Sequence, residues 1–301
     1  MASFSTIALR SGLGLAAIAV VGLLITRPEK LEPNALEGLV ANPENGALVY
    51  AAMGCASCHS APEGVEYPDG ALGGGKRFPS PFGTFVAPNI STHPTTGIGA
   101  WSDLDIANAV LLGTSPSGEH LYPAFPYATY TRAELQDVVD LIAHLRSLPA
   151  VDTPNEPHEI SFPMNMRVLL GGWKLLFLDR DWIITSDLTP EQERGRYLVE
   201  AMGHCGECHT PRNVLGGMIT SEWLAGAANA AGEGRIPNIT TGDLEWSAGD
   251  VAEYLSSGFT PEFDTAGAEM AEVIENTSQL PQEDRDAIAA YLQIVPPHEN
   301  K

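Results

Sequence analysis

The sequence Cys-x-x-Cys-His occurs twice in this chain, from Cys55 to His59 and again from Cys205 to His209. Further features follow both copies in the same order: a Pro-Asn-Ile triplet, a Trp-Ser pair with an aspartate at fixed spacing, and a closing glycine. They are Pro88-Asn89-Ile90, Trp101-Ser102, Asp105 and Gly113 in the first copy, and Pro237-Asn238-Ile239, Trp246-Ser247, Asp250 and Gly258 in the second. Matched features in one order predict a duplicated unit.

Each copy closes with apolar residues at helical spacing. This periodicity predicts helices over 134–148 and 283–295. Pro149 and Pro296 end them, because proline cannot continue a helix. The rest of each copy is rich in proline and glycine and shows little strand signal. We therefore expect an all-α chain.

The duplication also sets the expected domain organisation. Two tandem domains are predicted at 44–150 and 190–299, joined by a linker at 151–189 that contains an amphipathic helix. The linker is rich in aromatic residues such as Trp173, but its interspersed charges argue against a membrane span. It either packs between the domains or offers its aromatics to a partner surface.

The spacing of the motif points to a particular chemistry. Two thiols one helical turn apart can form thioethers with both vinyl groups of one porphyrin edge, and the adjacent histidine can then ligate iron beneath the ring. A zinc site needs four ligands where each cluster supplies three, a thioredoxin-like pair needs a parallel sheet, and a disulfide does not require the histidine. The sequence thus predicts two covalently bound haem c groups, with thioethers at Cys55, Cys58, Cys205 and Cys208 and proximal iron ligands at His59 and His209.

A second axial ligand for each iron is sought in the loop that precedes the closing helix, where small c-type cytochromes usually carry a methionine. In the second copy this residue is Met270, the only methionine after Met218. We predict that Met270 ligates iron; the alternative is that it fills space in the core. Asn89 and Asn238 are expected to bond either a loop backbone or a haem propionate.

The first copy has no methionine between residues 119 and 135, and Phe125 and Ala133 cannot ligate iron. An imidazole ligand would give a haem of lower potential than a methionine-ligated one, and an empty position would leave the iron open to small ligands. The remaining candidates for the distal ligand of this haem are His120, His93, Met164 and Met166.

Residues 1–30 are typical of either a secretory signal peptide or a short signal anchor. No residue from Ser11 to Thr26 is charged, and the residues after this run are not the small ones that signal cleavage needs. We expect an uncleaved N-terminal transmembrane anchor helix, although the run is only about 24 Å long against a hydrocarbon core of ~30 Å. Haem attachment at such motifs takes place outside the bacterial cytoplasm, so the expected location is the periplasmic side of the inner membrane.

Charge narrows the choice of partners. The chain has 38 acidic and 16 basic residues, a formal net charge of −22. Such a surface repels phosphate backbones, which excludes nucleic acid as a partner, and attracts a protein with a positive patch. The sequence contains no phosphate-binding glycine loop and no supported catalytic triad, so we assign no catalytic residue.

With both motifs in place, the chain resembles the cytochrome c subunits of membrane-bound bacterial alcohol and gluconate dehydrogenases over roughly residues 44–297. The resemblance implies two class I cytochrome c-like domains in a periplasm-facing electron carrier that accepts electrons from a dehydrogenase subunit. The alcohol dehydrogenase subunits carry three Cys-x-x-Cys-His motifs and this chain has two. The matching stretches are residues 88–90, 96–102, 120–127, 171–174, 203–213 and 270–273.

The expected function is therefore electron transfer by a membrane-tethered dihaem cytochrome c, from a dehydrogenase to quinone, another cytochrome or a terminal oxidase. The chain is more readily an electron-transfer subunit than a catalytic one. An alternative from another class is a dihaem peroxidase that uses an open first haem.

Overall fold

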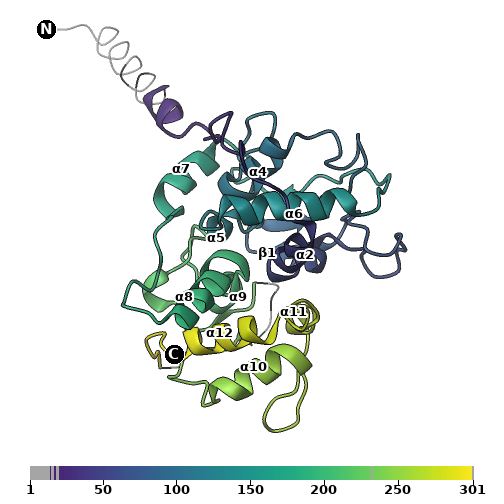
Figure 1. Cartoon of the computed structure of the whole chain (residues 1–301). Coiled ribbons are helices and arrows are strands. Elements are labelled where there is room, and N and C mark those ends of the chain that lie inside the picture. Colours follow the sequence, from purple (N-terminus) through teal and green to yellow (C-terminus); the bar gives the residue numbers. More distant parts are fainter. Residues whose placement is uncertain (1–13, 15–16, 18–19, 231, 233, 300–301) are drawn as a thin grey trace, which may run out of the picture.

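The structure is a computed structural model that describes residues 14, 17, 20–230, 232 and 234–299. Figure 1 shows two helical regions placed one above the other, with the described N-terminal residues projecting from the upper one. The helices and strands are α2 (Pro43–Ala52), α3 (Cys55–His59), β1 (Arg77–Ser80), β2 (Gly83–Val86), α4 (Asp103–Leu112), α5 (Tyr127–Tyr130), α6 (Leu135–Ser147), β3 (Glu159–Ile160), α7 (Leu169–Phe177), α8 (Pro190–Tyr197), the π-helix η1 (Leu198–Met202), α9 (Cys205–His209), the 3-10 helix η2 (Thr220–Glu222), β4 (Ala227–Ala228), β5 (Arg235–Ile236), α10 (Ala248–Ser257), α11 (Glu269–Thr277) and α12 (Gln282–Leu292).

We call residues 44–150 the first module and residues 190–299 the second module. In each, an opening helix packs against the closing helix: α2 on α6, and α8 on α12 (Figure 1). A glycine allows the close approach in both pairs. A Cβ on Gly46 would lie 2.0 Å from the Asp140 carbonyl oxygen, and one on Gly195 would lie 1.9 Å from that of Ala287. The predicted closing helices are confirmed within one to three residues at each end.

The matched Trp-Ser pairs begin matched helices, α4 and α10. Ser102 and Ser247 each form a capping box with an aspartate three residues later, which satisfies free N–H groups at the helix start. Gly113 and Gly258 end these helices in the left-handed region, where glycine has no Cβ penalty. The duplicated sequence features therefore set the bounds of a duplicated helix.

The prediction of an all-α fold is wrong. Strands β1, β2 and β3 form an antiparallel sheet in that order, and β4 pairs with β5 in a second antiparallel sheet. These strands have two to four residues, too few for a period-two pattern to appear in the sequence. Pro79 lies in the edge strand β1, a kind of sheet position that proline tolerates.

The predicted transmembrane anchor is also contradicted. Across the described residues, no helix is long and apolar enough to cross a membrane. Helical residues near the N-terminus end at Ile25, and the uncharged run is shorter than a bilayer core. Much of the expected anchor, residues 1–13, 15–16 and 18–19, lies outside the described residues.

The linker is fastened to both modules. Its strand β3 pairs with β2 of the first module. At its other end, the backbone N–H groups of Ile183 and Ile184 donate to the carboxylate of Glu200 in η1, at 2.6 and 3.1 Å. Glu200 is fully buried and accepts a third hydrogen bond from the hydroxyl of Tyr291, which in turn accepts one from Trp223. One cluster of buried apolar side chains runs through both modules.

Candidate functional site

Each Cys-x-x-Cys-His sequence forms one short helix, α3 in the first module and α9 in the second, and we call these helices the attachment turns. The two cysteines of each turn are three residues apart, so both thiols lie on one face. All four cysteines are free, and no cluster of His, Cys, Asp and Glu among the described residues could hold a metal ion by itself. The disulfide and zinc alternatives therefore find no support in these residues.

The histidine of each attachment turn is oriented by a proline carbonyl. The Nδ1 atom of His59 lies 2.8 Å from the Pro88 oxygen, and that of His209 lies 2.8 Å from the Pro237 oxygen. A carbonyl can only accept, so Nδ1 carries the hydrogen and Nε2 keeps its lone pair. Burial lowers the pKa of both histidines, which favours the neutral imidazole that a metal can bind.

The Pro-Asn-Ile triplets are what hold these two carbonyls. The Asn89 side chain donates to the Val151 and Thr153 oxygens at 2.7 and 3.0 Å and accepts from the backbone N–H of Ser91. Asn238 makes the corresponding bonds, donating to the His298 oxygen and accepting from Thr240. Both asparagines are therefore loop-fixing residues, the first of the two sequence-based alternatives.

A second backbone contact closes each site. The N–H of Gly74 donates to the His59 oxygen at 2.8 Å, and the N–H of Gly226 donates to the His209 oxygen at 2.7 Å. Sequence comparison of the two copies missed this pair, because glycine is common in both loops. With the prolines, these contacts give the two attachment turns the same fixed surroundings.

The loops after α4 and α10 have the same backbone geometry. In the first loop Thr114 forms an isolated antiparallel β-bridge with His120, and in the second Phe259 forms one with Thr265. In both loops the backbone N–H of the next residue donates to the oxygen of the closing glycine at 2.8 Å: Leu121 to Gly113, and Ala266 to Gly258. Phe125 lies five residues after His120, and Met270 lies five residues after Thr265. The structure thus places Phe125 at the position equivalent to Met270, which is half-buried at the start of α11.

The other candidates for the first distal ligand occupy separate places. His93 is hydrogen bonded to the Thr96 hydroxyl at 2.7 Å, and Met164 and Met166 are exposed. His120 is buried and its Nε2 donates to the Thr26 oxygen at 2.9 Å. Its Nδ1 is buried without a hydrogen-bond partner in the described part of the chain. None of the four stands at the position equivalent to Met270.

The two attachment turns are electrostatic neighbours. Burial raises the pKa of the Cys58 thiol to about 11, with smaller contributions in the same direction from the Glu272 carboxylate and from the Cys208 thiol of the other module. Burial also raises the pKa of the Cys55 and Cys205 thiols, to about 12. Thiols with such raised pKa values stay protonated at neutral pH.

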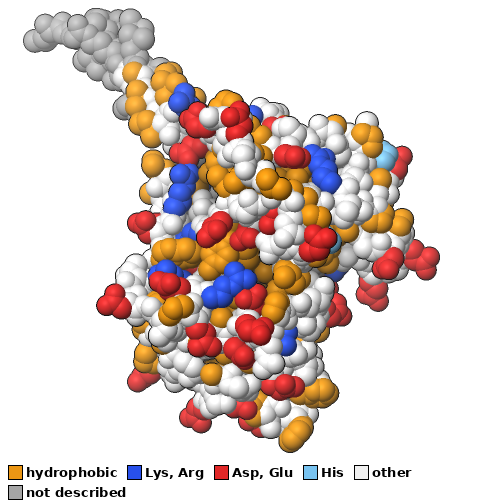
Figure 2. All heavy atoms as spheres, viewed as in Figure 1, with side chains coloured by type: hydrophobic (Ala, Val, Ile, Leu, Met, Phe, Trp, Pro, Cys, Tyr) orange, Lys and Arg blue, Asp and Glu red, His pale blue; other side chains and the backbone are white. Residues whose placement is uncertain are grey.

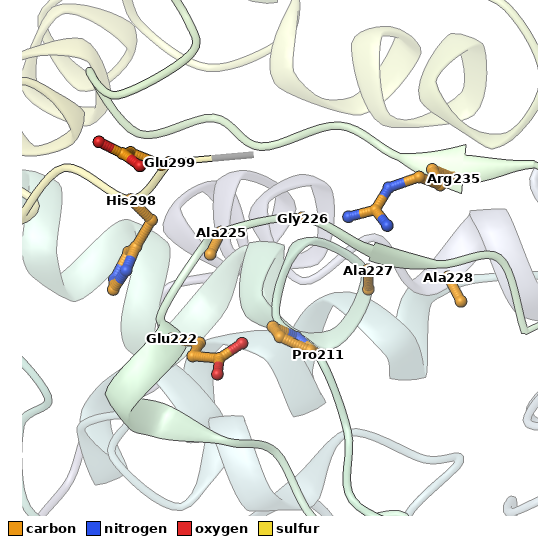
Figure 3. A pocket seen from close by; sticks show the side chains of 9 residues that line it. All are labelled: Pro211, Glu222, Ala225, Gly226, Ala227, Ala228, Arg235, His298 and Glu299. Atoms are coloured by element: carbon orange, nitrogen blue, oxygen red, sulfur yellow. The ribbon is translucent and has the colours of Figure 1, made fainter. Parts of the chain in front are cut away.

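A hollow of roughly 400 Å³ lies beside the second attachment turn (Figure 3). Its lining residues include Arg235, His298 and Glu299, together with Gly226, whose N–H donates to the His209 carbonyl. It contains no thiol and no His209 side chain, so it is not itself an attachment site.

Comparisons with known proteins agree with this geometry. The cytochrome c family model matches residues 43–149. The chain is 55% identical to a diheme cytochrome c-type protein of Cereibacter sphaeroides, over 96% of this chain and 98% of that protein. It is 36% identical to the fructose dehydrogenase cytochrome subunit of Gluconobacter japonicus and 32% identical to the alcohol dehydrogenase (quinone) cytochrome c subunit of Gluconacetobacter polyoxogenes.

The two dehydrogenase subunits are longer proteins. The alignments cover 90% and 88% of this chain but only 56% and 58% of those relatives. The near full-length match to the Cereibacter protein is the one that assigns the family. Together with the two attachment turns, it shows that this chain belongs to the dihaem c-type cytochromes and carries two covalently bound haem c groups.

Proposed function

We propose that this protein carries electrons on the periplasmic side of the cell, from a dehydrogenase to a downstream acceptor. The observation that carries the proposal is the pair of attachment turns, each with an imidazole whose Nδ1 is fixed by a proline carbonyl and whose Nε2 is available. The relatives named as cytochrome subunits of fructose, alcohol and gluconate dehydrogenases support a dehydrogenase as donor.

The residues divide the work as follows. Cys55, Cys58, Cys205 and Cys208 would form the thioethers, and His59 and His209 would bind iron through Nε2. Met270 would supply the second axial ligand in the second module. Haem iron, when bound, supplies a reversible one-electron change. The Pro88 and Pro237 carbonyls keep the proton at Nδ1, which raises the basicity of the opposite nitrogen and fixes the ring orientation.

The surface charge supports a donor or acceptor with a basic docking patch. Figure 2 shows acidic side chains spread over the visible face, with Lys and Arg side chains fewer between them. Field lines from a net charge of −22 would steer such a partner during encounter. The association rate is then expected to fall as salt shortens the Debye length, from ~30 Å at 0.01 M to ~10 Å at 0.1 M.

The test begins with the full chain purified under native conditions from the cells that make it. A pyridine haemochrome assay must return two c-type haems per chain. A dehydrogenase subunit is expected to co-purify, and its substrate should reduce both haems within the complex. If the chain purifies alone and no dehydrogenase substrate reduces it in the presence of the periplasmic fraction, the dehydrogenase-linked role is refuted.

One observation favours a second candidate function. Phe125 has no ligating atom, and it stands where the second module has Met270. A first haem without a sixth ligand would bind small molecules, as a dihaem peroxidase-like enzyme requires. Rapid peroxide turnover by the purified protein, with a high-spin signal that carbon monoxide abolishes, would favour this function over plain electron transfer.

A further inference from the structure

The residue before each attachment turn has left-handed backbone. In the first module it is Gly54, with φ 62°, and in the second it is His204, with φ 40°. Glycine adopts this conformation freely, but a residue with a Cβ pays roughly 1–2 kcal/mol for it. His204 is one of four non-glycine residues with positive φ in the described part of the chain, so we ask what holds it there.

The His204 ring contacts residues of the first module on two sides. Its ring reaches across the boundary between the modules to Gly54: a Cβ on Gly54 would lie 3.4 Å from the His204 Nε2. On the other side, the ring stands edge-on to Tyr130, with centroids 5.9 Å apart. The Tyr130 hydroxyl donates to the Met53 oxygen at 2.6 Å, immediately before Gly54. The His204 ring therefore packs against the backbone of Met53 and Gly54, immediately before the first attachment turn.

Reciprocal hydrogen bonds flank this contact. The third residue of each Cys-x-x-Cys-His sequence bonds the other module: Ser57 Oγ accepts from the Asn276 side chain at 2.7 Å, and Glu207 accepts from the Thr129 hydroxyl at 2.9 Å. Asn276 lies in α11, and Thr129 lies in α5, its counterpart in the first module. Each attachment turn is therefore hydrogen bonded to the other module: α3 to α11, and α9 to α5.

We propose that His204 is a positioning residue that holds the two attachment turns at a fixed separation and so sets the rate of electron exchange between the two haems. The exchange moves one electron from a ferrous haem to a ferric one and needs no proton and no further reactant. The inference rests on the proposed electron-transfer function and adds to it the residue that governs the internal step.

The experiment uses the full chain loaded with both haems. The variant His204→Gly removes the ring and suits the left-handed backbone, so it deletes the contact without adding strain. After laser-triggered reduction of the oxidised protein, redistribution of the electron between the haems is expected to slow by about tenfold or more, because such steps are sensitive to ångström-scale displacement. Magnetic coupling between the two ferric haems should weaken in parallel.

Two further variants separate positioning from folding. His204→Asn tolerates left-handed backbone and keeps a short polar side chain, and it should show an intermediate rate. His144→Ala removes another partly buried imidazole, tilted against Tyr50 in the first module with ring centroids 4.9 Å apart, and should leave the exchange rate unchanged. Should His204→Gly fail to load two haems, the comparison of His204→Asn with His144→Ala decides the question.

An unchanged exchange rate and unchanged coupling in loaded His204→Gly, or in His204→Asn if only that variant loads, overturns the proposal. A lowered melting temperature with an unchanged rate also overturns it, since that is the result of a purely structural role. Reduction of the wild-type protein by an external donor is recorded separately. Failure of that step refutes the proposed function, whereas a change confined to the internal step concerns His204.

Discussion

The first and second modules hold their attachment turns by the same means. In both, a proline carbonyl lies 2.8 Å from the histidine Nδ1, and a glycine N–H bonds the histidine carbonyl. The loops on the opposite side keep the same backbone bonds but end in Phe125 in one module and Met270 in the other. The histidine side is thus the same in both modules, whereas the residue at the Met270 position differs, so the proposed axial ligation differs between the two haems.

A second difference lies in the opening helices. The first module reaches its attachment turn through α2 alone, whereas the second inserts η1 between α8 and α9. The inserted π-helix carries the buried Glu200, which binds the linker and Tyr291. π-turns inside helices are frequent at functional sites. Here the extra turn gives the second module a polar anchor for the linker.

The largest effect is expected where the modules are most alike. Gly46→Ala and Gly195→Ala would each push a Cβ to within about 2 Å of a backbone oxygen in the facing helix. We expect a loss of about 3 kcal/mol or more in the free energy of unfolding for each, by overpacking. Gly172→Ala in α7, where nothing lies within 4 Å of the added carbon, is the control and should be neutral or slightly stabilising.

Denaturant unfolding of the haem-loaded variants measures this. If either variant keeps the wild-type midpoint, the close approach of the helices does not contribute as described.

The next effect should fall on one module only. Glu200→Ala leaves two backbone N–H groups and the Tyr291 hydroxyl without an acceptor in a buried site, at a cost of about 2–3 kcal/mol. Glu200→Gln keeps an acceptor and should lose less. Hydrogen exchange is expected to show faster opening of α8 and α12 and little change in α2 and α6. Equal destabilisation of both modules would contradict this local role.

Exchanging the distal residues would test the comparison at the iron. Met270→Phe should give the second haem the spectrum of the first, and Phe125→Met should give the first haem methionine ligation. The reduction potential of the altered haem is expected to move on the order of 0.1 V, downward in the first variant and upward in the second. Met218→Phe is the methionine control, and potentiometric titration with optical detection reads all three.

If Met270→Phe leaves both potentials unchanged, Met270 is a packing residue and the alternative reading of it holds.

The smallest effect concerns the end of α4. Lys174 donates to the Leu112 and Gly113 oxygens at 2.6 and 2.8 Å, and burial lowers its pKa to about 8 from 10.5. Between these two values the unfolded chain binds more protons, so stability should rise with pH relative to Lys174→Met. No such lysine bond is recorded at α10 in the described chain. Melting temperatures measured between pH 8 and 10.5 give the slope of stability against pH. Lys30→Met is the control for loss of an exposed lysine. Equal slopes in the wild type and Lys174→Met would contradict this role of Lys174.

Much of the site was predictable from the sequence because its chemistry is local. The attachment turns, the Pro-Asn-Ile loops and the bounds of α4 and α10 each follow from residues close together in the chain. The equivalence of Phe125 and Met270 was not predicted, although each lies 12 residues after the closing glycine of its copy. What these features share is that spacing alone determines the geometry.

The contacts that join distant segments were not predictable. Ser57 and Glu207 occupy the variable positions of the motif. Their sequence neighbours give no signal that Ser57 bonds Asn276 or that Glu207 bonds Thr129. The strands were missed because pairing over two to four residues leaves no periodicity, and Pro79 concealed β1. The predicted transmembrane anchor has no counterpart among the helices of the described residues, and its uncharged run is only about 24 Å long against a hydrocarbon core of ~30 Å.

The strand β3 has a consequence for how much chain the first site requires. The family match ends at residue 149, yet the oxygens that hold Asn89 belong to Val151 and Thr153, and β2 is completed only by β3. The smallest fragment able to reproduce this site must therefore extend to about residue 160. The Pro88 carbonyl that orients His59 can therefore reach its fixed position only when residues 151–153 are present as well.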